Sequence, residues 1–402
     1  MERKTGLYIH IPFCVRKCNY CSFLSFPADG APREAYSEAL VKEIKLRAQS
    51  LKKKNIDTVY VGGGTPSVLD ISQMRDIMHA VNTSFDVKDN AEITIEANPA
   101  TLGHKDGVML AKMQAYKYIG FNRLSMGVQS MDNDRLHFMG RIHTPQNIER
   151  DMEIVRRKGF YNVNLDMIFS VPGETAEDAL SDLEKILSFD PEHISCYSLQ
   201  IEEGTPFAKM IESGEISETS DEEDRATYHR ICERLKNAGY EHYEISNFAK
   251  PGYRSQHNSL YWNMDDYIGL GLGASGFVNG IRYKNTSDMD EYLKALGEGR
   301  LPAEEEHVNT AFDNISEAVF TGLRRIEGIS YTDAIEAYMR ADDADAIIGS
   351  GNAKEAFWAI FKEAGEEAED YASQGFLVID DEGLRLTEQG VDISNSIMSL
   401  FV

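Results

Sequence analysis

The stretch LYIHIPFCVRKCNYC, residues 7–21, joins a short apolar run to three closely spaced cysteines. Its first part, LYIHIP (7–12), has the length and the β-branched and aromatic content of a β-strand. Cys14, Cys18 and Cys21 follow at the spacing C-x3-C-x2-C. Three cysteines within eight residues suit a disulfide framework poorly, so they favour a metal site just beyond the strand in a protein of a reducing compartment.

The number of cysteines in this loop limits the metal that it can hold. Three thiolates can bind three irons of a cubane 4Fe-4S cluster and leave the fourth iron open. Tetrahedral zinc, or a cluster without an open iron, needs a fourth Cys or His. Phe23 is apolar, and His10 lies on the expected strand, where a structural histidine is the more common use. The loop therefore predicts an iron–sulfur cluster with one exchangeable position.

From residue 7 to about residue 200, short β-rich runs alternate with amphipathic stretches. This alternation is typical of repeated βα units around a parallel sheet. We predict six strands, at residues 7–12, 57–62, 92–98, 123–129, 162–169 and 193–199.

Three of these strands have two unlike faces, because successive side chains of a strand point to opposite sides. The more polar faces hold Glu92, Thr94, Glu96 and Asn98 in the third strand, Arg123, Ser125, Gly127 and Gln129 in the fourth, and Asn164, Asp166 and Ile168 in the fifth. A polar inner face predicts an open lumen around a ligand, and hence an α/β fold built as a partial (β/α)6 TIM-like barrel. An open sheet with half-exposed strands is the disfavoured alternative, because parallel sheets are normally covered on both faces.

The regular alternation fades after residue 200. Residues 221–239 predict a helix with an acidic first turn, and an irregular stretch rich in glycine and aromatic residues follows to about residue 305. In YASQGFLVIDDEGLRLTEQG (371–390), two short strands flank an Asp-Glu-Gly turn. We predict three parts: a barrel core at 1–205, a barrel-associated extension at 206–305, and a small C-terminal helical, winged-helix-like domain at 306–402.

The charge of the chain bears on its partners. The 402 residues include 66 acidic and 41 basic side chains, a formal net charge of −25. This balance opposes the counterion release that drives nucleic-acid binding, so no nucleic-acid partner is expected, even for a winged module. The first residues, MERKTGLYIHIPFC, resemble neither a signal peptide nor a transmembrane segment, so we expect a cytoplasmic protein.

The cysteine spacing and the strand pattern resemble the radical S-adenosylmethionine (SAM) superfamily over residues 7 to about 200. The resemblance implies a barrel of the radical SAM type, in which SAM chelates the fourth iron of the 4Fe-4S cluster held by Cys14, Cys18 and Cys21. It also implies the residues that bind SAM. These are Gly63, Gly64 and Thr65 within GGGTP (62–66), the polar residues Glu96, Gln129, Arg141 and Asp166 as in the coproporphyrinogen dehydrogenase-like branch, and the aromatic residues Tyr8 and Tyr20.

The chemistry of these residue types suits SAM. SAM is a sulfonium cation with a ribose diol, so its pocket needs carboxylate and amide acceptors and a cationic donor for the methionine carboxylate. Carboxylates such as Glu96 and Asp166 inside a barrel are costly unless they have partners. Arg141 has an alternative interpretation as an ordinary cation of a surface loop.

A second motif, HNSLYW at residues 257–262, matches the HNxxYW motif of HemW-type haem chaperones. This resemblance, which extends over essentially the whole chain, implies haem as a further cofactor. His257 would offer an imidazole to the iron, Tyr261 and Trp262 apolar surface to the porphyrin, and Asn258 a polar group that orients a neighbour. Without the resemblance, a histidine beside two aromatic residues more often reflects packing.

The resemblance leaves two functions open. The favoured one is a carrier that binds haem or a related tetrapyrrole and transfers it to an apo-haemoprotein acceptor, with the cluster and SAM serving as structure or switch. The alternative is an oxygen-independent coproporphyrinogen III oxidase, a radical SAM decarboxylase. Phe23 stands where that enzyme carries an additional cysteine, and only thirteen residues precede Cys14, where that enzyme has a long extension. Both features favour the carrier.

Three further features carry no site in this interpretation. GLGLGASG (269–276) contains a formal G-x-G-x-x-G, but we expect no strand before it and no helix after it, so no dinucleotide site is predicted. Ser275 stands where many HemW-type relatives carry a histidine, which removes a candidate second haem contact. Cys196 and Cys232 are expected to be inert, since free cysteine usually behaves as a small buried hydrophobe.

Overall fold

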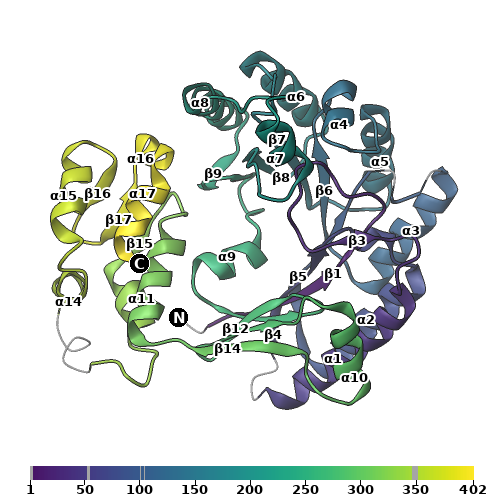
Figure 1. Cartoon of the computed structure of the whole chain (residues 1–402), viewed down its shortest axis with the longest axis horizontal. Helices are drawn as coiled ribbons and strands as arrows, with labels where there is room; N and C mark the ends of the chain where they lie inside the picture. Colours follow the sequence, from purple (N-terminus) through teal and green to yellow (C-terminus); the bar gives the residue numbers. More distant parts are fainter. Residues whose placement is uncertain (1–2, 52–54, 100, 104, 346–351) are drawn as a thin grey trace.

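The computed structural model describes residues 3–51, 55–99, 101–103, 105–345 and 352–402. Six parallel strands form its centre at the positions that the alternating sequence predicts. They are β1 (Thr5–Ile11), β4 (Asn55–Gly63), β5 (Asp86–Ala97), β6 (Arg123–Gln129), β7 (Val163–Phe169) and β8 (His193–Ser198). They pair in the order β1-β4-β5-β6-β7-β8, and the sheet is strongly curved (Figure 1). The prediction of a partial barrel is confirmed.

Amphipathic helices cover the outer face of this curved sheet (Figure 1). Their apolar sides pack on the outward residues of the strands, such as Leu124 and Met126 of β6, which are fully buried. Helix starts are fixed by capping boxes, for example at Thr144 and Thr175, whose side chains accept backbone N–H groups of the first turn. The helices are α1 (Arg33–Ser50), α2 (Ile71–Ser84), α3 (Asp106–Ile119), α4 (Asn133–Phe138), α5 (Pro145–Arg157) and α6 (Ala176–Ser188).

The extension after β8 is more regular than predicted. Residues 240–305 form strands that lengthen both ends of the sheet, so the expectation of an irregular stretch was wrong. The described sheet has 12 strands, in the order β14-β13-β12-β11-β1-β4-β5-β6-β7-β8-β10-β9. The elements are α7 (Pro206–Glu212), α8 (Asp221–Asn237), β9 (Glu241–Glu244), β10 (Asn247–Ala249), α9 (Gln256–Trp262), β11 (Asp266–Leu270), β12 (Ser275–Val278), β13 (Ile281–Asn285), α10 (Met289–Gly297) and β14 (Ala303–Val308). The short strands escaped prediction because glycine-rich turns interrupt them before alternation becomes visible.

Three details of this extension bear on the site. β11 pairs in parallel with β1, with Leu7 opposite Ile268, so β1 lies inside the sheet and not at its edge. The motif GLGLGASG does follow a strand, β11, which corrects the expectation that it would not. It leads into strand β12 and opens no helix, so the dinucleotide fingerprint remains incomplete. Helix α9 lies on the inner side of the curve, against β1, β4 and β11 (Figure 1).

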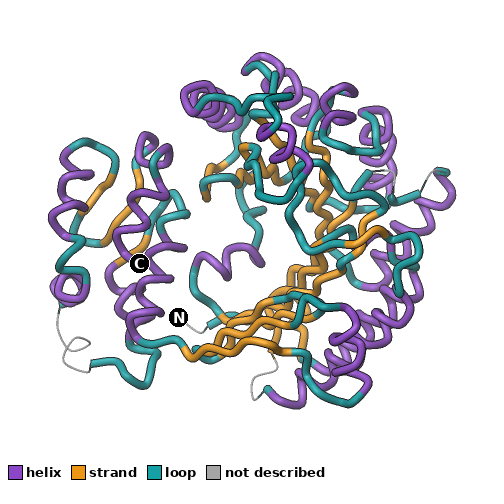
Figure 2. Tube along the Cα trace, viewed as in Figure 1, coloured by secondary structure: helices purple, strands orange, loops and turns teal. Residues whose placement is uncertain are grey.

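The C-terminal region is a small helical unit with a three-stranded sheet in the order β15-β17-β16 (Figure 2). The predicted hairpin is confirmed, since β16 and β17 pair antiparallel with Val378 opposite Arg385. The elements are α11 (Ala311–Gly322), β15 (Ile329–Ser330), α12 (Tyr331–Tyr338), α14 (Ala353–Ile360), α15 (Gly365–Ser373), β16 (Leu377–Ile379), β17 (Gly383–Leu386), α16 (Glu388–Asp392), α17 (Ser394–Met398) and the 3-10 turn η2 (Ser399–Phe401).

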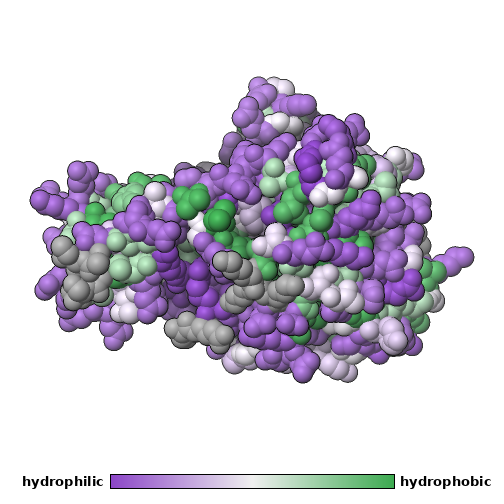
Figure 3. Space-filling model, turned by 90° about the horizontal axis from the view of Figure 1, so that it is seen from below, coloured by the Kyte–Doolittle hydropathy of each residue, from purple (hydrophilic) through white to green (hydrophobic). Residues whose placement is uncertain are grey.

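Hydrophilic side chains cover most of the face seen in Figure 3, which agrees with the acidic composition. Among the described helices, none combines the length and the apolar character that crossing a lipid bilayer requires.

Candidate functional site

A cavity of about 440 Å³ occupies the lumen at the carboxyl ends of the parallel strands. The polar strand faces predicted from alternation line it, including Glu96 of β5, Ser125 and Gly127 of β6, and Asn164 and Asp166 of β7. Ligands of parallel α/β barrels bind at this end of the strands, because the connecting loops gather there. The predicted open lumen is therefore present, and polar side chains of several strands contribute to its wall.

The three clustered cysteines lie at the mouth of this cavity and line it. Cys14 ends the short strand β2 (Phe13–Cys14), which pairs with β3 (Phe26–Pro27), and Cys18 and Cys21 follow in the loop between them. All three are half-buried and none forms a disulfide. The backbone N–H of Ala28 donates to the Cys14 carbonyl at 2.7 Å, which closes the loop so that all three sulfurs stay at one rim.

The arrangement of the three sulfurs bears on the kind of metal that they could hold. Within the described residues, no three Cys, His, Asp or Glu side chains converge closely enough to hold one metal ion. In a cubane each thiolate binds a different iron, so the sulfurs surround the cluster and do not converge on one point. Cys14 accepts a hydrogen bond from Thr65 Oγ1 and Cys18 accepts one from Arg141 Nη1, each at 3.5 Å. Such donors stabilise thiolate charge.

The GGGTP segment connects the end of β4 to the cysteine loop. Gly63 has a φ of 108°, and a Cβ there would lie 2.4 Å from the His10 ring, so only glycine fits. The N–H groups of Gly64 and Thr65 donate to the carbonyls of Ile11 and Phe13 at 2.9 and 2.8 Å. The Gly63 N–H donates to Glu96 Oε2 at 3.1 Å. The segment therefore joins the cysteine loop to a carboxylate of the lumen.

Arg141 is a half-buried part of this pocket and not a cation of a surface loop. Its Nη2 donates to Asn98 Oδ1 at 2.6 Å and to the Gly127 carbonyl at 2.7 Å. Asn98 in turn donates to Thr65 Oγ1 at 2.8 Å. These bonds hold the guanidinium between the cysteine loop and β6, where it can also donate to a carboxylate ligand.

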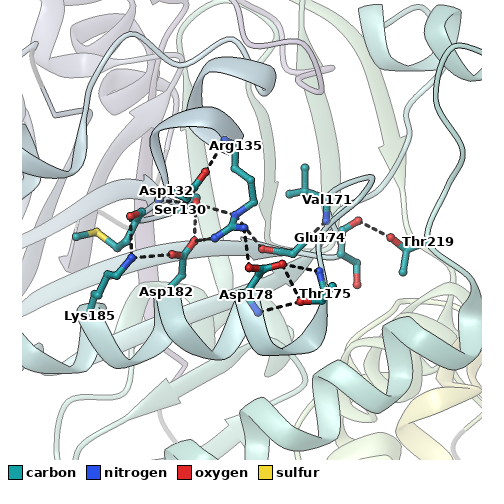
Figure 4. Close-up of polar contacts among 12 residues, drawn as sticks. Ser130, Asp132, Arg135, Val171, Glu174, Thr175, Asp178, Asp182, Lys185 and Thr219 are labelled. Carbon is teal, nitrogen blue, oxygen red and sulfur yellow. Dashed lines mark hydrogen bonds and ion pairs between the residues drawn. The ribbon is translucent and has the colours of Figure 1, made fainter.

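A buried ion network holds the segment that leads to Arg141 (Figure 4). Arg135 of α4 forms ion pairs with Glu174 at 3.3 Å and Asp182 at 3.1 Å, and its Nε donates to Ser130 Oγ at 3.3 Å. Asp132 caps α4 by accepting the Arg135 N–H at 2.9 Å. Burial raises the pKa of Glu174 to about 7, an effect that Arg135 opposes. The turn from β6 through α4 is thereby fixed to α6.

The lumen also presents acceptors of the kind that SAM requires. Burial raises the pKa of Glu96 to about 7 and also raises the pKa of Asp166. Asn164 donates to Asp166 Oδ1 at 2.7 Å. The Gln129 side-chain oxygen is buried and has no hydrogen-bond partner in the described part of the chain, and this residue has a positive φ of 67°. A buried acceptor without a partner, on a residue in a rare backbone conformation, indicates a site where a bound ligand would supply the hydrogen-bond donor.

The two predicted aromatic residues differ in position. Tyr20 lines the cavity, whereas Tyr8 is not part of its lining. The Tyr8 hydroxyl lies 2.9 Å from His10 Nδ1, and His10 Nε2 lies 3.0 Å from the Leu24 carbonyl. Both ring nitrogens of His10 are thus engaged within the protein, which supports the structural reading of this histidine over the role of a fourth cluster ligand.

The HNSLYW motif forms helix α9 beneath the lumen. Glu92 accepts the backbone N–H of Gln256 at 3.2 Å and of His257 at 3.0 Å, so a buried carboxylate holds the first turn of the helix. His257 is 1% exposed. Its Nδ1 lies 2.7 Å from Thr58 Oγ1 and its Nε2 lies 2.9 Å from the Tyr261 hydroxyl. Burial lowers the pKa of His257 to about 3, so the ring is neutral and both nitrogens are occupied in this arrangement.

The other predicted residues of the motif point in different directions. Asn258 lines the cavity. The guanidinium carbon of Arg324 lies over Trp262, 4.9 Å from the centroid of the indole ring. The buried Nε1 of Trp262 is without a hydrogen-bond partner among the described residues. Ser275 is exposed on β12 and outside the cavity lining. The motif therefore reaches from the lumen to the C-terminal region.

Several cavity residues were not predicted as ligands. Asn98 and Arg123 stood on faces already recognised as polar, but their roles needed the three-dimensional contacts. The lining also includes Tyr60, Ser195 and Tyr197. Alternation within DTVYVG (57–62) and HISCYSL (193–199) could have identified these three, because each sits at an inward position of its strand.

A parallel strand core, a three-cysteine loop at its carboxyl end and an open polar lumen together define a radical SAM protein. Residues 8–186 match the model of the radical SAM superfamily. The solved coproporphyrinogen III oxidase (HemN) from Escherichia coli, a radical SAM enzyme, has the same fold, with a TM-score of 0.82 over 100% of this chain and 90% of that one at 22% identity.

Curated relatives narrow the assignment. The heme chaperone HemW of Lactococcus lactis is 33% identical over 100% of this chain and 98% of its own length. HemW of Escherichia coli is 32% identical over 99% of this chain and 98% of its own length. The chain belongs to the HemW family of the radical SAM superfamily.

Proposed function

We propose that this protein is a haem carrier of the cytoplasm, which binds haem through the HNSLYW helix and passes it to an apo-haemoprotein. The observation that carries the proposal is that Asn258 of α9 lines the lumen, next in the chain to the buried His257. The full-length similarity to heme chaperones supports it. Because His257 Nε2 is bonded to Tyr261, iron ligation by this atom requires exchange of that hydroxyl for the metal.

The radical SAM site has a separate role in this proposal. Cys14, Cys18 and Cys21 would hold the cluster, and Arg141, Glu96, Gln129 and Asp166 would hold SAM, in keeping with the orphaned Gln129 oxygen. A bound cluster supplies one-electron chemistry. The chain's own residues would orient the ligand. Arg141 would donate to the ligand carboxylate, and Glu96 and Asp166 would accept from its hydroxyl or amine groups.

A second candidate is an oxygen-independent coproporphyrinogen III oxidase. The fold shared with HemN favours it, although at 22% identity this likeness concerns architecture alone. Phe23 is 67% exposed at the mouth of the cavity, where the oxidase carries a further cysteine. An apolar, unreactive side chain at this position weakens the oxidase alternative.

One experiment separates the two functions. Anaerobically reconstituted protein is given SAM, reductant and coproporphyrinogen III, and protoporphyrinogen formation is measured beside haem binding and haem transfer to an apo-haemoprotein. Haem binding and transfer without decarboxylation are expected. Substantial decarboxylation would overturn the carrier proposal.

The ligand is tested by His257→Ala, with His79→Ala as the control because His79 is exposed on α2. Loss of one axial ligand is expected to lower haem affinity at least about tenfold and to change the haem absorption spectrum. The control is expected to match the wild type. Unchanged haem affinity in His257→Ala would make the imidazole a packing residue of the barrel floor.

A further inference from the structure

The side chain of Tyr60 physically joins the two candidate sites. Tyr60 lies on β4 and lines the cavity. Its hydroxyl donates to Glu96 Oε1 at 2.7 Å, on the SAM side. Its ring stacks on the His257 ring, with centroids 5.1 Å apart and planes inclined by 27°. One rigid aromatic side chain therefore contacts a ligand-facing carboxylate at one end and the buried imidazole at its face.

The imidazole has little freedom to move independently of Tyr60. Thr58, two residues earlier on the same face of β4, bonds His257 Nδ1, and Tyr261 bonds Nε2. A Cβ on Gly6 of β1 would lie 3.0 Å from His257 Cε1, so the ring also packs directly on the backbone of that strand. Because interiors are close-packed, a shift of the Tyr60 ring is transmitted to its stacked neighbour.

The other end of Tyr60 competes with a ligand. Glu96 uses Oε2 to hold the Gly63 N–H of the GGGTP segment and Oε1 to accept from Tyr60. A ligand amine or hydroxyl that binds Glu96 shares these oxygens with the tyrosine hydroxyl. The strength and direction of the Tyr60–Glu96 bond therefore depend on whether the pocket is filled.

We propose that Tyr60 is a positioning residue that couples occupancy of the SAM pocket to the position of His257 and helix α9. For haem as the second ligand this inference rests on the proposed function, but the coupling itself concerns two groups of this chain. Linkage makes the effect reciprocal, so SAM alters haem affinity by the same factor by which haem alters SAM affinity. Tyr60→Phe keeps the stacked ring and removes only the hydroxyl bond.

The first test needs no haem. The chain has two tryptophans, Trp262 on α9 and Trp358 on α14, so Trp358→Phe leaves Trp262 as the single reporter of the helix. In this background, SAM is titrated against the reconstituted protein, and SAM binding is measured in parallel by equilibrium dialysis. We expect SAM to change Trp262 emission in the parent, and to bind Tyr60→Phe without that change. Tyr118→Phe, whose side chain is 90% exposed on α3, is the control and should behave as the parent.

The second test measures haem affinity with and without SAM. We expect a difference of at least about fivefold in the wild type and a ratio near one in Tyr60→Phe. If the wild type binds no haem, the proposed function fails, while the emission test still decides whether Tyr60 couples SAM binding to helix α9. If SAM leaves Trp262 emission unchanged in the parent, or Tyr60→Phe keeps the change, the coupling proposal is overturned. Loss of SAM binding in Tyr60→Phe would make Tyr60 a direct ligand contact, which also overturns it.

Discussion

Arg141 donates from Nη1 to the sulfur of Cys18 at 3.5 Å, so one guanidinium contacts the proposed cluster loop and also lines the proposed SAM pocket. Its second nitrogen is fixed by Asn98 and by the Gly127 carbonyl. A cation in this position stabilises the thiolate that binds iron and can also meet the carboxylate of an iron-bound ligand. Cluster and ligand are therefore expected to respond together to changes of this residue.

Arg141→Gln should weaken SAM binding by about 10- to 100-fold, because a charge-assisted hydrogen bond contributes about 1.5–3 kcal/mol. SAM affinity is measured by equilibrium dialysis on protein of matched iron content. Arg157→Gln is the control, since Arg157 is 60% exposed on α5. Equal SAM affinity in Arg141→Gln and Arg157→Gln would remove Arg141 from the binding site.

Replacing any one of Cys14, Cys18 or Cys21 with alanine should abolish stable cluster binding, because two thiolates leave two irons without protein ligands. Iron and acid-labile sulfide are measured after anaerobic reconstitution. Cys232→Ala is the matched control: Cys232 is half-buried on α8, and burial raises the pKa of its thiol to about 12. A cluster that persists at full iron content in Cys21→Ala would contradict the three-cysteine site.

SAM affinity should rise as the pH increases through about 7. Burial raises the pKa of Glu96 to about 7, so its carboxyl loses the proton there and becomes a stronger acceptor for ligand donors. In the ligand-free protein the same raised pKa means that the folded state holds a proton that the unfolded state releases. The free energy of unfolding therefore falls as the pH rises from about 4.5 through about 7.

The check is a series of SAM binding measurements from about pH 6 to about pH 8 on the wild type and on Glu96→Gln. The variant should lose most of the rise, with any remainder assigned to Asp166, whose pKa burial also raises. Glu149→Gln, at an exposed position of α5, should keep the wild-type profile. A flat profile in the wild type would show that Glu96 does not receive the ligand.

Arg135→Gln should lower the free energy of unfolding by about 3–5 kcal/mol, because it leaves the buried Glu174 without its cation and Asp182 with only Lys185, 3.7 Å away. The side chains of Glu174 and Asp182 are 2% and 1% exposed. Chemical denaturation measures the loss. Arg157→Gln breaks an exposed pair with Glu153 and should cost less than about 0.5 kcal/mol. Similar losses in both variants would show that the network of Figure 4 contributes no more than a surface pair.

Much of the barrel could be read from the sequence because its strands repeat one local rule. Glu96 and Asp166 stand at inward positions of β5 and β7, where the alternation of the strands predicts both. The cysteine loop can also be recognised from the sequence, since its C-x3-C-x2-C spacing involves only residues that are close together in the chain. Both features depend on residues that lie close together in the sequence.

The features that escaped prediction depend on distant contacts. Helix α9 has only seven residues, too few for a period to show, and its place inside the curve follows from Glu92 and Thr58, more than 160 residues earlier. Glu174 and Asp182 look like ordinary charges around an amphipathic helix, and only the approach of Arg135 from α4 reveals their burial. No local sequence pattern predicts these contacts between residues that are distant in the chain.

The pairing of β1 with β11 affects how the chain folds during its synthesis. Thr5 lies opposite Asp266, so one edge of β1 has no partner strand until a segment more than 250 residues further along the chain has been synthesised. β4 can join its other edge early, but the exposed edge invites wrong partners throughout synthesis. Completion of the sheet beside the cysteine loop is therefore tied to synthesis of β11, and truncated chains ending before β11 should be substrates for chaperones and proteases.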